Sequence, residues 1–238
     1  MKKLITVAAA SICIFSFSSC IKEVVNGSGP EITQTRTTGN FTAIDLVMNA
    51  TVYYTQDSVF KIEIKAQQNV ANEIITEVSN NKLTIRLPWD TKLISYSPVS
   101  VIISAPAVSD FNVSGSGQIN AGALSVSNSD FNVSGSGNIS VASIITNDVD
   151  ARVSGSGGVQ INGGSTETAE TDISGSGNAD LLGVAAKRGN VNMSGSGESK
   201  LNVSDELDVH ISGSGKVYYM GNPTISSSIS GSGKLIHL

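Results

Sequence analysis

The sequence predicts an all-β fold, a single-stranded β-helix (β-solenoid), and three observations favour it. The tetrapeptide Ser-Gly-Ser-Gly occurs seven times in register, beginning at Ser114, Ser134, Ser154, Ser174, Ser194, Ser212 and Ser230. Apolar and polar residues alternate before each copy, as in a strand with one buried face. The copies contain 14 of the 24 glycines, so the abundance of glycine reflects a structural repeat and not disorder.

The residues before each tetrapeptide form columns of constant character. The position directly before it is always apolar: Val113, Val133, Val153, Ile173, Met193, Ile211 and Ile229. The position before that is always polar: Asn112, Asn132, Arg152, Asp172, Asn192, His210 and Ser228. One place further back the column is mostly apolar: Phe111, Phe131, Ala151, Thr171, Val191, Val209 and Ser227. We therefore expect one strand in each repeat, with the apolar columns facing a core.

The glycines predict a tight corner after each of these strands. Glycine reaches backbone angles that other residues avoid, and serine hydrogen-bonds neighbouring amides, so Ser-Gly-Ser-Gly suits a sharp change of direction. A second short strand follows each corner, beginning at Ile119, Ile139, Val159, Ala179, Val217 and Leu235, with Ser199 as the exception.

The repeat length predicts how these units assemble. A unit of 18 to 20 residues cannot bury its own apolar face, but stacked units cover one another. Stacking at about 4.8 Å would place the seven corners along one edge of roughly 29 Å. The 18-residue spacings also suit a left-handed hexapeptide helix, but the six-residue apolar period of that fold is absent. A right-handed coil is therefore favoured.

Residues 109–238 are expected to form the seven-repeat β-helix, and residues 39–108 to form β-rich coils without glycine corners. In this N-terminal part we expect strands over Phe41 to Tyr54, Phe60 to Lys65, Leu83 to Leu87 and Val99 to Ser104. Asn80-Asn81 suits a turn. Apolar residues at 70, 74, 75 and 78 have helical spacing, which predicts one short helix over Val70 to Val78.

The first residues predict export and a lipid anchor. Residues 1–19 have two lysines ahead of an apolar run from Leu4 to Phe17, as in a secretory signal, and the run is shorter than the ~18 residues of a membrane span. Ser18 and Ser19 precede Cys20, an arrangement that resembles a bacterial lipobox, and the resemblance implies lipidation of Cys20. Residues 20–38 are polar and predict a lipidated tether. Ile21 after the cysteine favours the outer membrane, facing the periplasm or the cell surface.

Composition excludes several classes of partner. Removing the signal leaves 13 basic and 20 acidic residues, a balance that argues against nucleic acid and anionic lipid surfaces. The only cysteines are Cys13, within the signal, and Cys20, so we expect no disulfide in the mature chain. The membrane contact is expected through the lipid anchor alone.

The sequence offers little for catalysis. His210 and His237 have no companion ligands, so no metal site and no cofactor are expected. Ser58 and Lys61 match Ser-x-x-Lys but lie in an alternating strand without the other motifs of that enzyme class. We therefore expect no enzyme activity.

Two groups of residues remain as candidates for binding. One column, Asp110, Asp130, Asp150 and Glu170, could form a ligand or cation ladder, or a solvated edge that prevents strand addition. The aromatic residues could stack on sugars or be isolated surface residues: Tyr53, Tyr54, Trp89, Tyr96, Tyr218 and Tyr219.

The lipobox, the mixed N-terminal strands and the serial corners from Gly115 to Gly233 together resemble the exported putative autotransporter adhesin, head GIN domain family. The resemblance covers about residues 39–238. It implies a pectin-lyase-type β-helix without a retained active site, and an adhesive role by analogy of architecture.

The function expected from these observations is an outer-membrane or cell-surface lipoprotein that acts as a non-catalytic adhesion or scaffold β-helix, with a surface glycan or protein as partner. The alternative is a carbohydrate-binding or polysaccharide-degrading β-helix. The apolar residues Leu235, Ile236 and Leu238 in the last coil also predict a homo-oligomer joined through that end.

Overall fold

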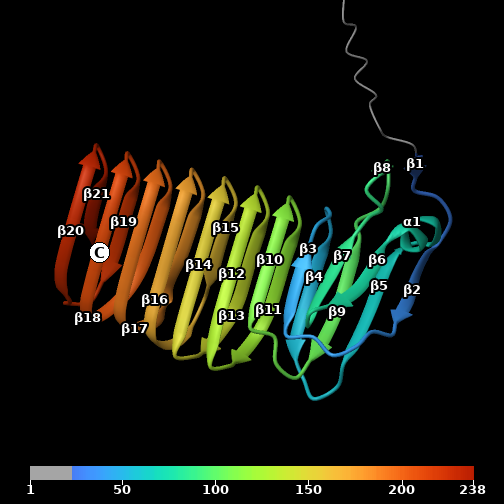
Figure 1. Ribbon diagram of the computed structural model, residues 1–238, viewed down its shortest axis with the longest axis horizontal. Helices are drawn as coiled ribbons and strands as arrows, with labels where there is room; N and C mark the ends of the chain where they lie inside the picture. The colour runs from blue at the N-terminus through green and yellow to red at the C-terminus, as the bar shows by residue number, and fades with distance from the viewer. Residues whose placement is uncertain (1–22) are drawn as a thin grey trace, which may run out of the picture.

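The computed structural model describes residues 23–238 as a nearly all-β solenoid of about 6 turns, with 70% strand and one short helix (Figure 1). Each turn has a front strand that leads into a Ser-Gly-Ser-Gly corner and a back strand that follows it. Front strands pair with front strands and back strands with back strands, all in parallel, along the repeat region. The predicted fold class and its repeat unit are confirmed.

In the later coils of the repeat region, before the last one, successive strands merge across the bend between back and front and are therefore longer. The shorter ones are β10 (Asp110–Gly115), β11 (Gln118–Ser125), β12 (Asn128–Gly135), β13 (Asn138–Ile145), β14 (Asp148–Gly155) and β15 (Gly158–Ile161). The merged ones are β16 (Gly164–Gly175), β17 (Asn178–Gly195) and β18 (Glu198–Gly213), and the last coil is β19 (Lys216–Met220), β20 (Thr224–Gly231) and β21 (Lys234–His237).

The glycine corners set the spacing of the coils. The first glycine of every tetrapeptide has a positive φ, which is +118° at Gly175. The second glycine lies against the preceding coil: a Cβ on Gly177 would lie 2.4 Å from Cγ1 of Val153 and 2.6 Å from the carbonyl oxygen of Gly157. Only glycine fits both positions at this distance between coils. The amide of Ser176 then donates to the carbonyl of Gly155 at 2.9 Å, which joins the two corners.

The apolar columns fill the space between front and back strands. Phe111 and Phe131 are fully buried and stack with ring centroids 5.5 Å apart, and Tyr54 packs edge-on against Phe111. The column continues with smaller residues toward the C-terminus. One of its two polar members, Thr171, is buried and shares a hydrogen bond of 2.9 Å with Ser199 of the opposite strand. These two exceptions in the predicted apolar columns therefore satisfy each other, and the third, Ser227, is exposed in the last coil.

The N-terminal part continues both sheets and then covers their end. Its elements are β3 (Ala43–Leu46), β4 (Thr51–Gln56), β5 (Lys61–Gln67), α1 (Gln68–Glu73), β6 (Ile75–Ser79), β7 (Lys82–Arg86), β8 (Thr91–Ile94) and β9 (Ser100–Ala105). The helix α1 buries Val70 and Ala71 at the end of the core, and Arg36 donates to the carbonyl oxygen of Ala71. This end of the solenoid is capped.

Two predicted boundaries in this part are wrong. The helix expected over Val70 to Val78 ends at Glu73, because residues from Ile75 form β6, which pairs with β7 in a hairpin. Asn80 and Asn81 form its turn with positive φ, as predicted. The strand expected over Phe41 to Tyr54 is interrupted between β3 and β4, where the chain turns from one sheet to the other.

The tether expected over residues 20–38 also differs from the structure. Residues in this range form β1 (Glu23–Asn26), which pairs with β8, and β2 (Glu31–Arg36), which pairs antiparallel with β5. Alternation in EITQTR places Ile32 against the core, a short pattern that a polar composition conceals. The predicted signal and Cys20 lie outside the described residues.

Replacing a corner glycine tests the stacking. Gly175→Val should lower the free energy of unfolding by about 1 to 3 kcal/mol, because the new side chain would combine a strained positive φ with a Cβ 2.6 Å from the carbonyl oxygen of Gly155. Urea denaturation measures the effect. Ser176→Val, at an exposed position of the same corner, is the control and should change stability by less than ~0.5 kcal/mol. Coincident midpoints for Gly175→Val and wild type would contradict the role of this corner.

Candidate functional site

The acidic column lies on the outer face of the front strands. Asp110, Asp130, Asp150 and Glu170 occupy the same register position on β10, β12, β14 and β16, and all four are partly buried. Each carboxylate therefore has a like charge on the adjacent strand. The next rung carries Asn190, so the run of acids spans four strands.

Arg152 holds this column together. Its Nη1 lies 3.3 Å from Asp130, its Nη2 contacts Asp150, and its Nε lies 3.7 Å from Asp172. Burial acts to lower the pKa of Arg152, but the surrounding carboxylates raise it above its ordinary value. The carboxylates around the guanidinium therefore favour its charged form.

Asp150 is the most perturbed member of the column. Burial raises the pKa of its carboxyl from 3.8 to about 6, against the attraction of Arg152. The neighbouring carboxylates of Glu170, Asp130 and Asp172 raise the pKa further. Oδ1 of Asp150 is buried and has no hydrogen-bond partner among the described residues. Ionised Asp150 is thus a cost to the fold at neutral pH.

That cost predicts a pH dependence. The folded pKa of Asp150 lies above the unfolded value of about 3.9, so the folded state binds the proton more tightly and stability falls as pH rises from about 4 to 7. Asp150→Asn should remove about 1 to 3 kcal/mol of this fall and be more stable than wild type at pH 7. Chemical denaturation at pH 4 and 7 measures it.

The control for this change is Asp148→Asn, an exposed position on the same strand, where the difference from wild type should stay within ~0.5 kcal/mol. Wild type and Asp150→Asn with parallel stability profiles from pH 4 to 7 would refute the assignment.

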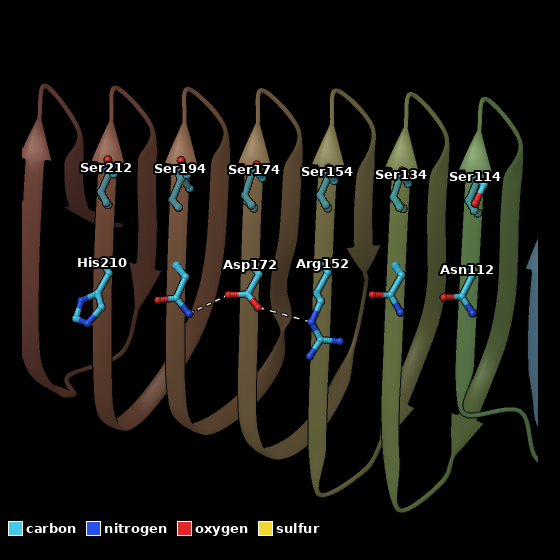
Figure 2. Close-up of a pocket in the computed structure, with 18 of the residues that line it drawn as sticks. Asn112, Ser114, Ser134, Arg152, Ser154, Asp172, Ser174, Ser194, His210 and Ser212 are labelled. Atoms are coloured by element: carbon cyan, nitrogen blue, oxygen red, sulfur yellow. Dashed lines mark hydrogen bonds and ion pairs between the residues drawn. The ribbon is translucent and has the colours of Figure 1, made fainter.

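A groove of about 820 Å³ runs across the front strands beside the acidic column (Figure 2). One side is the polar row, which comprises Asn112, Asn132, Arg152, Asp172, Asn192 and His210 and ends at Ser228. The other side is the serine row, the first serine of each tetrapeptide from Ser114 to Ser230. The groove follows the axis of the solenoid, and its volume is in the range of ligand sites.

Some neighbouring side chains of the polar row contact one another. Asn192 donates to Oδ1 of Asp172 at 2.9 Å, and Arg152 approaches the other carboxylate oxygen, as Figure 2 shows. His210 is exposed at the C-terminal end of the row, 3.6 Å from Asp208. Arg152, Asp172 and Asn192, which come from three consecutive repeats, are thus held in place with respect to one another, and this stretch of the wall is preorganised.

The remaining sequence candidates do not gather at this groove. Ser58 donates to Asp57, whereas Lys61 pairs with Glu63 at 3.0 Å. Tyr54 is buried and donates its hydroxyl to the carbonyl of Ala105, so it offers no surface for sugar stacking. Trp89 is 75% exposed at the N-terminal end. Among residues 23–238 no three or more His, Cys, Asp or Glu side chains, the acidic column included, are placed so that they could hold a metal ion, and no helix is long and apolar enough to cross a membrane.

The sequence predicted both rows of the groove but not the groove itself. The alternation identified the outward column from Asn112 to Ser228, and the repeat identified the serines. The hollow between the two rows lies over the main chain of the residues from Val113 to Ile211, whose side chains point inward, and sequence reasoning did not consider that surface.

Fold and site together define a β-solenoid with a ligand-sized groove on one face. The chain belongs to the family described as "Putative auto-transporter adhesin, head GIN domain", whose model matches residues 40–223, and the predicted resemblance is confirmed. Among curated proteins, none matches the chain.

Several solved structures share the fold. A putative adhesin from Bacteroides fragilis is 24% identical with a TM-score of 0.83, and the match covers 90% of this chain and 100% of that one. A putative lipid binding protein from Parabacteroides distasonis is 23% identical with a TM-score of 0.77, covering 90% and 99%. A putative adhesin from Parabacteroides merdae is 23% identical with a TM-score of 0.73, covering 90% and 99%. At these identities the likeness establishes the fold.

Proposed function

We propose that the protein is a non-catalytic adhesion lipoprotein whose binding surface is the outer face of the front strands. The observation that carries this proposal is the groove, which crosses seven strands and is lined by side chains from every repeat. A continuous surface of this length suits an extended partner better than a small substrate. The adhesin names of the family and of two similar structures agree with the proposal.

The proposal is tested with residues 21–238 on an array of glycans and host-matrix proteins. Saturable binding to an immobilised component, without turnover of any glycan in solution, is expected. Absence of binding across the array, or release of glycan fragments by the purified protein, would overturn the proposed function.

The proposed location is the outer membrane, through a lipid on Cys20. The support is the sequence of the signal and the cysteine, together with a body that begins at Glu23, close behind that cysteine. Because β1 lies at the capped end, the anchor would hold this end at the membrane and leave the last coils farthest from it (Figure 1).

Replacing the cysteine tests the anchor. Cys20→Ala should move the protein from the membrane fraction to the soluble periplasmic fraction, or leave it unprocessed, because loss of the lipid removes the apolar chain that holds it. Membrane fractionation and immunoblotting measure the distribution. Cys13→Ala, within the signal run, is the control and should leave the distribution unchanged. Equal membrane retention of Cys20→Ala and wild type would contradict lipid anchoring.

We also propose that two copies associate through the last coil. The outer edges of β20 and β21 have no strand partner within residues 23–238, and Ile225 and Ile229 are 40% and 42% exposed. β20 carries no charged side chain, so an antiparallel pair about a two-fold axis at Ser227 brings no like charges together. That register sets Ile225 opposite Ile229 of the partner subunit.

Charged substitutions at this edge test the association. Wild-type residues 21–238 should form dimers at micromolar concentration, and Ile225→Asp with Ile229→Asp should yield monomers, because carboxylates would lie opposite each other across the axis. Sedimentation velocity measures the assembly state. Ile145→Asp, at a more exposed isoleucine in the middle of the stack, should stay dimeric. A wild type that remains monomeric throughout would refute the association.

A further inference from the structure

The floor of the groove differs from its walls. Between the polar row and the serine row lie the residues from Val113 to Ile211, whose side chains point into the core. The floor is therefore main chain, and its amide and carbonyl groups are used in the parallel pairing of the front strands. It presents C–H groups to a ligand, flanked by polar side chains on both sides.

The serine row offers hydrogen bonds without charge, and the polar row offers amides beside the paired charges of Arg152 and Asp172. None of the serine-row hydroxyls, Ser114 to Ser230, forms a hydrogen bond within residues 23–238, so each is free to donate and accept. Amide groups such as Asn132 have the same dual capacity. The serine hydroxyl recurs on every front strand that lines the groove, at the inter-strand spacing of about 4.8 Å, whereas the amides stand at Asn112, Asn132 and Asn192.

The charges beside the groove disfavour an anionic ligand. Arg152 is the one arginine or lysine that lines it, and this cation is already paired with Asp130, Asp150 and Asp172. His210 lies beside Asp208. A phosphate or uronic acid polymer would thus meet carboxylates without a free cation.

An extended peptide is also a poor fit. Peptides are commonly held by strand addition, in which a free sheet edge supplies the main-chain hydrogen bonds. The front strands that line the groove from β10 to β18 are paired on both sides, so only side chains are available to a ligand there.

We propose that the groove binds a neutral linear glycan aligned with the solenoid axis. Sugar rings present C–H faces and hydroxyl edges, which match the main-chain floor and the two polar walls. The main-chain floor and the serine row recur on every strand of the groove, so successive sugars meet the same groups there and affinity should rise with chain length. This inference rests on the proposed function and names the ligand class for its binding surface.

The test uses calorimetry with linear neutral oligosaccharides of glucose, mannose and xylose from disaccharide to hexasaccharide. Hexagalacturonate and an uncharged extended peptide are the comparison probes. At least one neutral series should bind, with affinity increasing with length. Ser154→Arg and Ser174→Arg, which fill the groove from its exposed wall, should weaken hexasaccharide binding at least tenfold.

The matched control is Gln160→Arg, which adds the same side chain at an exposed position on the back strand of the same coil and should change the dissociation constant less than twofold. Equal thermal midpoints would establish that all variants are folded. Binding that is insensitive to Ser154→Arg, a preference for hexagalacturonate or the peptide, or no binding of any neutral hexasaccharide would overturn the proposal.

The results that would overturn glycan binding in the groove can be distinguished from those that would overturn the proposed adhesive function. Array binding that persists in Ser154→Arg leaves adhesion standing and removes the groove as its site. Loss of all array binding by the wild type removes both.

Discussion

The close, in-register approach of successive glycine corners is the constraint on which the structure depends. At Gly175 and Gly177 any side chain would collide with the corner before it, while the amide of Ser176 bonds to the carbonyl of Gly155. Each coil is held only by its neighbours, so a wider corner would weaken the ladders on both sides of it. The serines between these glycines therefore lie along one edge of the solenoid at a fixed spacing.

Register converts sequence columns into rows of contacting side chains. Inside the solenoid, the Phe111 and Phe131 rings stack because they occupy the same position in adjacent coils. Outside, the same rule forces carboxylates together, and Arg152 offsets this repulsion from the middle of the cluster. Burial still raises the pKa of Asp150 to about 6, so the compensation is incomplete. In a stacked fold, a residue type that recurs in one column therefore contacts itself on adjacent strands, whether that contact is favourable or unfavourable.

The repeat region could be predicted from the sequence because its signal recurs seven times. The N-terminal part could not be predicted to the same detail, since the short strand β2 depends on β5, a partner distant in the chain. Helical spacing from Val70 to Val78 was outweighed by the hairpin that pairs Val78 with Leu83. Thr171 and Ser199 show the same limit, because their hydrogen bond spans the core between two columns that sequence reasoning treated separately.

The division between inward and outward columns also explains how this fold can present a variable ligand-binding surface. Inward positions and corners are fixed by packing, as the clash at Gly177 shows, so they cannot change to suit a ligand. The polar row is free of that limit and changes from Asn132 to Arg152 to Asp172 over three adjacent strands without altering the backbone register. Specificity can therefore be encoded in the side chains of this row, while the serine row and the main-chain floor provide a constant surface beside it. On each front strand, alternation places the residues that pack the core on the inner face and the residues that can contact a ligand on the outer face.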